Sequence, residues 1–346
     1  MPLNATELAN LANASLDFHL REAAQSQVLQ DRPLFNDLVA MKDEFPGGKE
    51  YLTEAVKGQY TTSMKGYDHD DEQQYVNPAN IKRTQVKWHE VSSGISTTYT
   101  ELKRNGIIVT DDGDSYGGSS VSGAELVQLT NILDDKIDDL MEGSKRSLAD
   151  MFWRDGTQDS KAIPGVLSFI LDAPTTGTTF GIDRAANSWW RNRATLSIST
   201  ASAANQTLVQ TLQKEFRQLR RYAKNPKHRI YAGSDFMDWF EQELRAKGNY
   251  TLEGWSKSGK IDASVADLMF KGVALQYEPL LDDLSRSKYG YVLDMNQIKL
   301  TTMNGEWMKK HTPRRPVEKY AMYMALTVTG AIKARQLNSS GVYAIA

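Results

Sequence analysis

The stretch TFGIDRAANSWWRNRA, residues 179–194, places two adjacent tryptophans among three arginines, an aspartate and two asparagines. One explanation is that Trp189 and Trp190 fill the core while Arg191 and Arg193 lie solvated at its flanks. Consecutive residues of an extended segment point to opposite faces, so both indoles enter one core only if the segment turns or lies between two surfaces. Tryptophan and arginine are also enriched at the centres of protein interfaces. The composition therefore favours a contact between subunits, made by Trp189, Trp190 and Arg191.

The composition of the 346-residue chain argues against several classes of protein. Its 41 basic and 43 acidic residues give a formal net charge of −2, whereas a dedicated nucleic-acid-binding protein carries a strongly basic face. The chain has no cysteine, which excludes disulfides and thiolate metal sites. The longest apolar run, VLSFIL at 166–171, is far short of the roughly 20 residues that span a bilayer. The N-terminus lacks a signal-peptide pattern, so we expect synthesis and residence in the cytoplasm and no membrane contact.

The clearest helix of the chain is predicted between Ser122 and Asp155. Its leucines, isoleucine and methionine recur at steps of three or four residues, and Ser122 is a candidate N-cap. A helix of about 30 residues is roughly 45 Å long, whereas the mean in globular proteins is about 11 residues. We therefore expect it to form the spine of an extended body, with Gly143 and Ser144 allowing a bend or a close approach.

A long hairpin is predicted over residues 51–106. Two runs rich in Thr, Tyr, Val and Ser, at 58–67 and 84–100, are typical of strands and flank the polar segment DHDDEQQYVNPAN, residues 68–80. An ordinary hairpin is one interpretation. So polar a tip has few side chains to bury, which favours a projecting hairpin that needs a partner surface, with candidate contact residues Tyr67, His69 and Tyr75.

The remaining segments alternate between helical and strand patterns, which indicates an α+β fold. Helices are predicted at 207–225, which Asn225-Pro226 ends, and at 234–248. The last third alternates apolar and polar residues and predicts a half-buried antiparallel sheet. The predicted strands are 228–233, 272–279, 288–303 and 321–336.

No motif predicts catalysis, a metal or a cofactor. GSSVSG at 118–123 lacks the lysine of a phosphate-binding loop, and DGDSYG at 112–117 lacks the ligands that close a calcium loop. His89-Glu90 begins a zinc motif, but Ser93 replaces its second histidine. DDKIDD at 134–139 is typical of the solvated face of a helix. We therefore expect no cofactor and no enzymatic activity.

One basic segment, MKKHTPRRP at 308–316, leaves two interpretations open. Arg314 and Arg315 could contact phosphate or an acidic partner, which makes them candidate contact residues. Alternatively, the segment is a charged loop between strands that Pro313 and Pro316 keep extended.

The order of these features resembles the major capsid proteins of tailed bacteriophages, which have the Hong Kong 97 fold. The most specific likeness lies in IPGVLSFI, residues 163–170, followed by GIDRAANSWWRN, residues 181–192. The resemblance implies an arm, an extended loop, a peripheral domain with a spine helix and long sheet, an axial domain, and strands that return to both domains. The corresponding ranges are 1–50, 51–106, 107–160, 161–297 and 298–346.

The resemblance also implies a function and partners. Copies of the chain would form pentamers and hexamers and close an icosahedral shell around double-stranded DNA, bound without sequence specificity. The virion would be assembled in the host cytoplasm with a portal and a separate scaffolding protein; whether a decoration protein binds stays open. Two alternatives remain: an encapsulin-type compartment with an enzyme cargo, and a soluble metal- or nucleotide-dependent enzyme.

Overall fold

A computed structural model describes residues 30–72, 75–78, 80–104, 123–200, 207–223, 225–246, 268–311 and 321–346. The chain divides into two units, residues 1–31 and 32–346, and the second contains all the elements named below. Residues 1–29, which make up most of the segment expected to be an arm, lie outside the described residues. No described helix is both long enough and apolar enough to cross a membrane.

The long helix expected between Ser122 and Asp155 is confirmed as α4 (Gly123–Trp153), 31 residues in length. Its C-terminal part is buried, with Leu148, Phe152 and Trp153 each at most 3% exposed. The expected close approach occurs at Ser144, whose hydroxyl lies 2.5 Å from that of Ser93. A larger side chain at this position would hold the helix away from the neighbouring strand.

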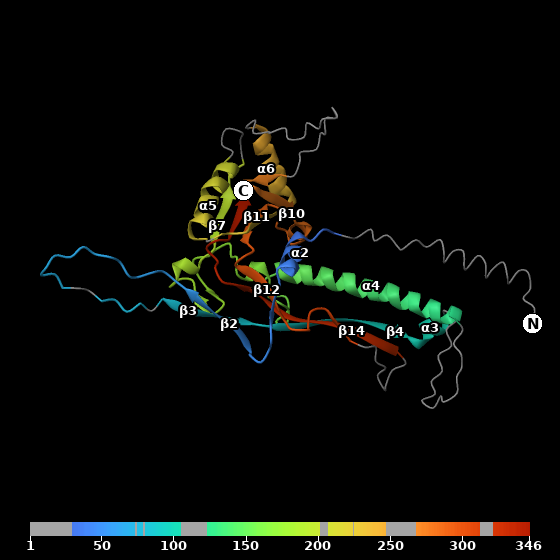
Figure 1. Cartoon of the computed structure of the whole chain (residues 1–346). Coiled ribbons are helices and arrows are strands. Elements are labelled where there is room, and N and C mark those ends of the chain that lie inside the picture. The colour runs from blue at the N-terminus through green and yellow to red at the C-terminus, as the bar shows by residue number, and fades with distance from the viewer. Residues whose placement is uncertain are drawn as a thin grey trace, which may run out of the picture. The chain divides into compact units, whose positions relative to one another are not determined.

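The first sheet is built on the 14-residue strand β14 (Ala321–Ala334), which pairs with three strands. Strand β4 (His89–Thr98) pairs antiparallel along residues 321–330, β12 (Ile298–Met303) along 330–334, and β13 (Lys309–Lys310) at two residues. The antiparallel sheet expected from the last third is thus confirmed in part, with one parallel strand added at its edge, β1 (Asp43–Phe45). The single strand expected at 288–303 is wrong, because it divides into β11 (Tyr289–Asp294) in the second sheet and β12 in this one, and the strands expected at 228–233 and 272–279 pair parallel in the second sheet. Helix α4 contacts both β4 and β14 and runs alongside them in Figure 1.

Helix α2 (Pro33–Ala40) and β1 lie within the segment expected to be an arm. They belong to the body of the second unit, because Leu34, Phe35 and Leu38 are buried in its main core. The carboxylate of the buried Glu278 accepts a hydrogen bond from the backbone N–H of Leu34 at 3.1 Å, which satisfies an amide in the first turn of α2.

The second sheet is mixed and has the order β7-β15-β11-β8-β10-β9. The helices expected at 207–225 and 234–248 are confirmed as α5 (Leu208–Tyr222) and α6 (Ser234–Ala246). Phe216 of α5 and Phe236 and Phe240 of α6 belong to the same buried cluster beside this sheet. The strands are β7 (Arg193–Ile198), β8 (His228–Ala232), β9 (Met269–Phe270), β10 (Val273–Tyr277), β11 (Tyr289–Asp294) and β15 (Gly341–Ile345), with the short helix α7 (Pro279–Asp283) after β10.

The hairpin is shorter than predicted. Strands β2 (Tyr51–Lys57) and β3 (Ile81–Lys87) pair from Tyr51↔Lys87 to Lys57↔Ile81, and the segment between them leads away from their ends in Figure 1. The strand expected at 58–67 is wrong, because those residues have no partner strand and their side chains are exposed. The run at 84–100 is divided: β3 pairs with β2, β4 pairs with β14, and the helix α3 (Tyr99–Arg104) follows.

Candidate functional site

The segment 179–192 folds on itself in two tight turns. Strands β5 (Thr178–Thr179) and β6 (Ile182–Asp183) pair across Phe180 and Gly181, whose φ angles of 51° and 79° are those a two-residue hairpin turn requires. The 3-10 helix η2 (Ser188–Trp190) then reverses the chain. Both indoles therefore lie on one side, with ring centroids 5.7 Å apart.

The turn changes the interpretation of the two tryptophans. Trp190 is 1% exposed, and its indole N–H donates to the carbonyl of Thr179 at 3.1 Å, so the core-filling explanation holds for this residue. Trp189 is only partly buried. Arg191 donates from Nε to the carbonyl of Arg184 at 2.7 Å and from Nη2 to that of Ala185 at 2.8 Å. Contacts of Trp189 and Arg191 with another subunit stay a prediction. Trp190, which is enclosed in the core of its own chain, is not kept as a contact residue.

Arg184 ties this segment to the residue that follows the 3-10 helix η1 (Val166–Ser168). Its guanidinium is fully buried and donates to Thr179 Oγ1 and Asn192 Oδ1, each at 2.7 Å, and to the carbonyl of Phe169. No carboxylate of the described residues forms an ion pair with it, and burial lowers its pKa to about 10. The guanidinium is therefore held by neutral acceptors alone, which fixes the geometry of the turn.

Trp189 covers the base of the loop between β2 and β3. A Cβ on Gly58 would lie 2.8 Å from Cε2 of Trp189, so only glycine admits the indole at this distance. Gly58 donates its N–H to the carbonyl of Asn80 at 2.8 Å, and Gln85 of β3 donates its N–H to the carbonyl of Phe180 at 2.9 Å. We call these residues, Gly58, Asn80, Gln85, Phe180 and Trp189, the loop anchor.

A set of ion pairs holds the middle of β2 to the first sheet. Glu54 accepts from Lys333 Nζ at 2.8 Å and from Arg335 Nε and Nη2 at 2.7 and 3.1 Å. Burial acts to raise the pKa of Glu54, but the hydrogen bonds from Arg335 and Lys333 outweigh it and lower the pKa to about 2. Glu54 is thus ionised at neutral pH and fixes the hairpin to β14.

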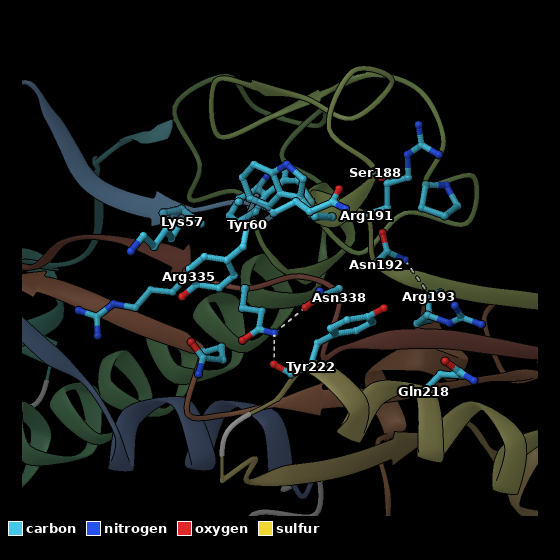
Figure 2. A pocket seen from close by; sticks show the side chains of 18 of the residues that line it. Lys57, Tyr60, Ser188, Arg191, Asn192, Arg193, Gln218, Tyr222, Arg335 and Asn338 are labelled. Atoms are coloured by element: carbon cyan, nitrogen blue, oxygen red, sulfur yellow. Dashed lines mark hydrogen bonds between the residues drawn. The ribbon is translucent and has the colours of Figure 1, made fainter. Parts of the chain in front are cut away.

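A groove of about 990 Å³ lies beside the loop anchor, because Gly58 and Trp189 form part of its wall. Figure 2 shows side chains that line it. Residues 55–60 and 188–194 form much of its wall. The others come from α5, from the segment after β14, and from Pro174 and Gln297. The described residues that line it include four cations and no carboxylate. The cations are Lys57, Arg191, Arg193 and Arg335, and the aromatic side chains are Tyr60, Trp189, Trp190 and Tyr222.

The other candidate residues lie apart from this groove. Tyr67 and Tyr75 are 72% and 89% exposed on the loop between β2 and β3, and the His69 ring contacts the carboxylate of Asp68 at 3.1 Å. The structure does not bring them into contact with Trp189 or Arg191 within one chain. Arg314 and Arg315 lie outside the described residues, as does the segment 112–122 that carries the incomplete phosphate and calcium loops.

No group of three or more His, Asp or Glu side chains that could hold a metal occurs in the described parts of the chain. His89, which begins the incomplete zinc motif, lies in β4, and burial lowers its pKa. Ser93, at the position of the missing ligand, contacts Ser144 of α4. The contact between Ser93 and Ser144 packs helix α4 against strand β4.

Sequence reasoning missed three residues on which this region depends: Glu54, Gly58 and Arg184. Glu54 meets partners 279 and 281 positions away, which no local pattern can indicate. For Gly58, the only local signal is that a glycine directly follows a strand, β2. Arg184 lies in a visibly polar segment, and its burial is decided only by the turns on either side.

The chain resembles known proteins in its structure. No protein-family model matches it, and no curated protein matches it. Solved structures do match over nearly the whole chain. The capsid asymmetric unit of cyanophage A-1(L) has a TM-score of 0.65 at 14% identity and covers 93% of this chain and 94% of its own.

Two further structures agree with the cyanophage match. The capsid of the myovirus XM1 has a TM-score of 0.53 at 10% identity, covering 95% and 98% of the two chains. The capsid of a native GTA particle has a TM-score of 0.52 at 12% identity, covering all of both chains. The resemblance to tailed-phage major capsid proteins is thereby confirmed at the level of the fold.

Proposed function

We propose that this chain is the major capsid protein of a tailed bacteriophage, a structural subunit that assembles with copies of itself into an icosahedral shell around double-stranded DNA. The observation that carries the proposal is the match of 93% of the chain to a phage capsid subunit with a TM-score of 0.65. The structure supports it independently, because the loop between β2 and β3 exposes large apolar side chains that a partner surface would cover.

The proposal assigns the parts of the Hong Kong 97 fold to the elements of this chain. Residues 1–50 are the arm, of which α2 and β1 join the body, and 51–106 carry the extended loop. Residues 107–160, with α4 as the spine helix, belong with β4 and β14 to the peripheral domain. Residues 161–297 form the axial domain around the second sheet, and 298–346 return through both domains.

The exposed loop gives the proposal its physical reason. Tyr60, Met64, Tyr67 and Tyr75 are between 72% and 103% exposed. Such a group of large side chains on one segment is typical of a surface that becomes buried on association. The loop anchor holds this segment at its base, so that subunits present it in one orientation.

The remaining partners follow from the proposed role. Subunits of the pentamers and hexamers would meet at their axial domains. The chain would contact the phosphate backbone of the DNA, which carries no sequence information. A separate scaffolding protein and a portal would direct assembly in the host cytoplasm. Tyr67, His69, Tyr75, Trp189, Arg191, Arg314 and Arg315 remain proposed contact residues; no observation favours the compartment or the enzyme over the capsid.

The proposal is tested by expressing the full chain with and without its genomic neighbours and examining the particles by negative-stain electron microscopy and light scattering. Closed shells, or rings of five and six subunits, are the expected result. Shells that form only with a co-expressed scaffold distinguish the phage capsid from a compartment that assembles alone. A uniform small oligomer under every condition would contradict the proposal.

A further inference from the structure

The groove beside the loop anchor carries positive charge that the chain itself does not neutralise. Two of its four cations are paired: Arg193 with Glu215 at 2.8 Å and Arg335 with Glu54 at 2.7 Å. Lys57 and Arg191 have no carboxylate partner among the described residues; Lys57 lies 5.3 Å from the centroid of the Tyr60 ring.

The loop between β2 and β3 carries the opposite charge at its tip. Residues 68–72, Asp-His-Asp-Asp-Glu, contain four carboxylates and are all exposed. The tip is a closed turn, because Asp71 donates its N–H to the carbonyl of Asp68 at 3.1 Å and Asp71 Oδ2 accepts from the N–H of Asp68 at 3.0 Å. Asp70 and Glu72 form no ion pair with any described residue. The turn therefore presents free carboxylates on a preformed scaffold, which lowers the entropy cost of binding.

We propose that the groove is the docking site for the acidic loop tip, residues 68–72, of a second copy of this chain. This inference rests on the proposed shell function and names the surface that receives the loop. Carboxylates of Asp70 and Glu72 would pair with Lys57 and Arg191, a contact in which charge complementarity fixes partner and register. Tyr67 would lie near the partly buried Trp189 and the exposed Tyr222.

The geometry favours another copy over the loop's own chain. Residues 57–60 form part of the groove wall, the hydrogen bond of Gly58 to Asn80 closes the base of the loop, and in Figure 1 the loop leads away from there. Because the tip and the receiving groove lie on different parts of one subunit, the contact is head-to-tail. Such contacts generate a ring of subunits when the rotation between neighbouring subunits closes.

A charge-swap experiment tests the pairing. The groove variant is Lys57→Glu with Arg191→Glu, the tip variant is Asp70→Lys with Glu72→Lys, and a third chain combines all four. Each reversed pair alone is expected to lower assembly yield by at least about tenfold, and the combined chain to recover most of it. Lys214→Glu with Arg217→Glu, two exposed cations of α5 outside the groove, is the control of equal charge change and should assemble normally.

A cross-linking experiment separates this inference from the proposed function. Because the chain has no cysteine, one copy can carry Gln59→Cys in the groove wall and another His69→Cys in the tip. A short bis-maleimide should join the two different copies in solution, and should not join His69→Cys to Lys214→Cys. A cross-link between small oligomers that never form shells would support the groove while refuting the capsid.

Four results would overturn the docking proposal. The first is normal shells from a folded groove variant. The second is a folded groove variant whose assembly the tip variant does not rescue. The third is shells in which the two cysteine copies fail to cross-link. The fourth is a chain with both cysteines that cross-links to itself at high dilution, which would assign the groove to its own loop. Circular dichroism confirms folding in each case.

Discussion

Replacement of the buried Arg184 by methionine isolates the contribution of its guanidinium to the fold. Methionine keeps an unbranched side chain of similar length but donates no hydrogen bond. In Arg184→Met, the Thr179 hydroxyl oxygen and the carbonyl of Phe169 lose this donor inside the protein. Asn192 Oδ1 retains the N–H of Leu171 at 3.1 Å, so this acceptor is not left alone.

The expected loss of stability follows from two opposing effects. Three hydrogen bonds from a charged donor contribute about 1.5–3 kcal/mol each. Burial of the charge opposes them: it lowers the pKa of Arg184 from 12.5 to about 10, which corresponds to roughly 3 kcal/mol. The difference predicts that Arg184→Met lowers the free energy of unfolding by about 1.5–6 kcal/mol.

The matched control is Arg191→Met, the same substitution seven residues later in the same segment. Arg191 also donates two hydrogen bonds to backbone carbonyls, but its guanidinium reaches solvent, so about 1 kcal/mol or less is expected. Urea unfolding of the unassembled subunits, followed by circular dichroism at pH 7, measures both values.

The reasoning would be refuted if the free energies of unfolding of the two variants differed by less than about 1 kcal/mol. A difference that small lies within the extrapolation error of urea unfolding. It would be refuted equally if Arg184→Met were more stable than the wild type. In that case the cost of burying the charge would exceed the hydrogen bonds, as occurs in some buried ion pairs.

Three further predictions concern the same region and the long helix. Trp190→Ala should lower the free energy of unfolding by about 3–5 kcal/mol, whereas Trp189→Ala should cost less and act mainly on assembly, which urea unfolding and shell yield distinguish. Gly165→Ala should yield little folded protein, because its Cβ would lie 2.2 Å from the carbonyl oxygen of Phe152; normal circular dichroism and solubility would contradict this. Glu54 has a folded pKa of about 2 against 4.5 when unfolded, so its stabilisation is complete above pH 4.5 and is lost as the pH falls towards 2. Glu54→Gln should therefore be less stable than wild type by about 1–2 kcal/mol at pH 7, with a gap that narrows by pH 3; a constant gap in urea midpoints would refute the ion-pair role.

Elements with a local pattern could be predicted from the residues alone. Helices α4, α5 and α6 and strands β8 and β14 were predicted because a side-chain period of 3.6 or 2 residues records which face an element buries. The absence of cysteine and the near-balance of charge also limited the classes of protein to which the chain could belong. The order of these elements supported the resemblance to a capsid fold.

Contacts between distant segments depend instead on how the whole chain folds. Residues 58–67 have the composition of a strand but no partner, and a strand exists only where another backbone completes its hydrogen bonds. Trp190 enters the core because η2 turns the chain, and Trp189 reaches Gly58 across more than a hundred residues. Glu54 is ionised at its site because Lys333 and Arg335 arrive from the end of β14. Local periodicity encodes which side of an element is apolar, whereas the identity of what covers that side is fixed only when the whole chain has packed.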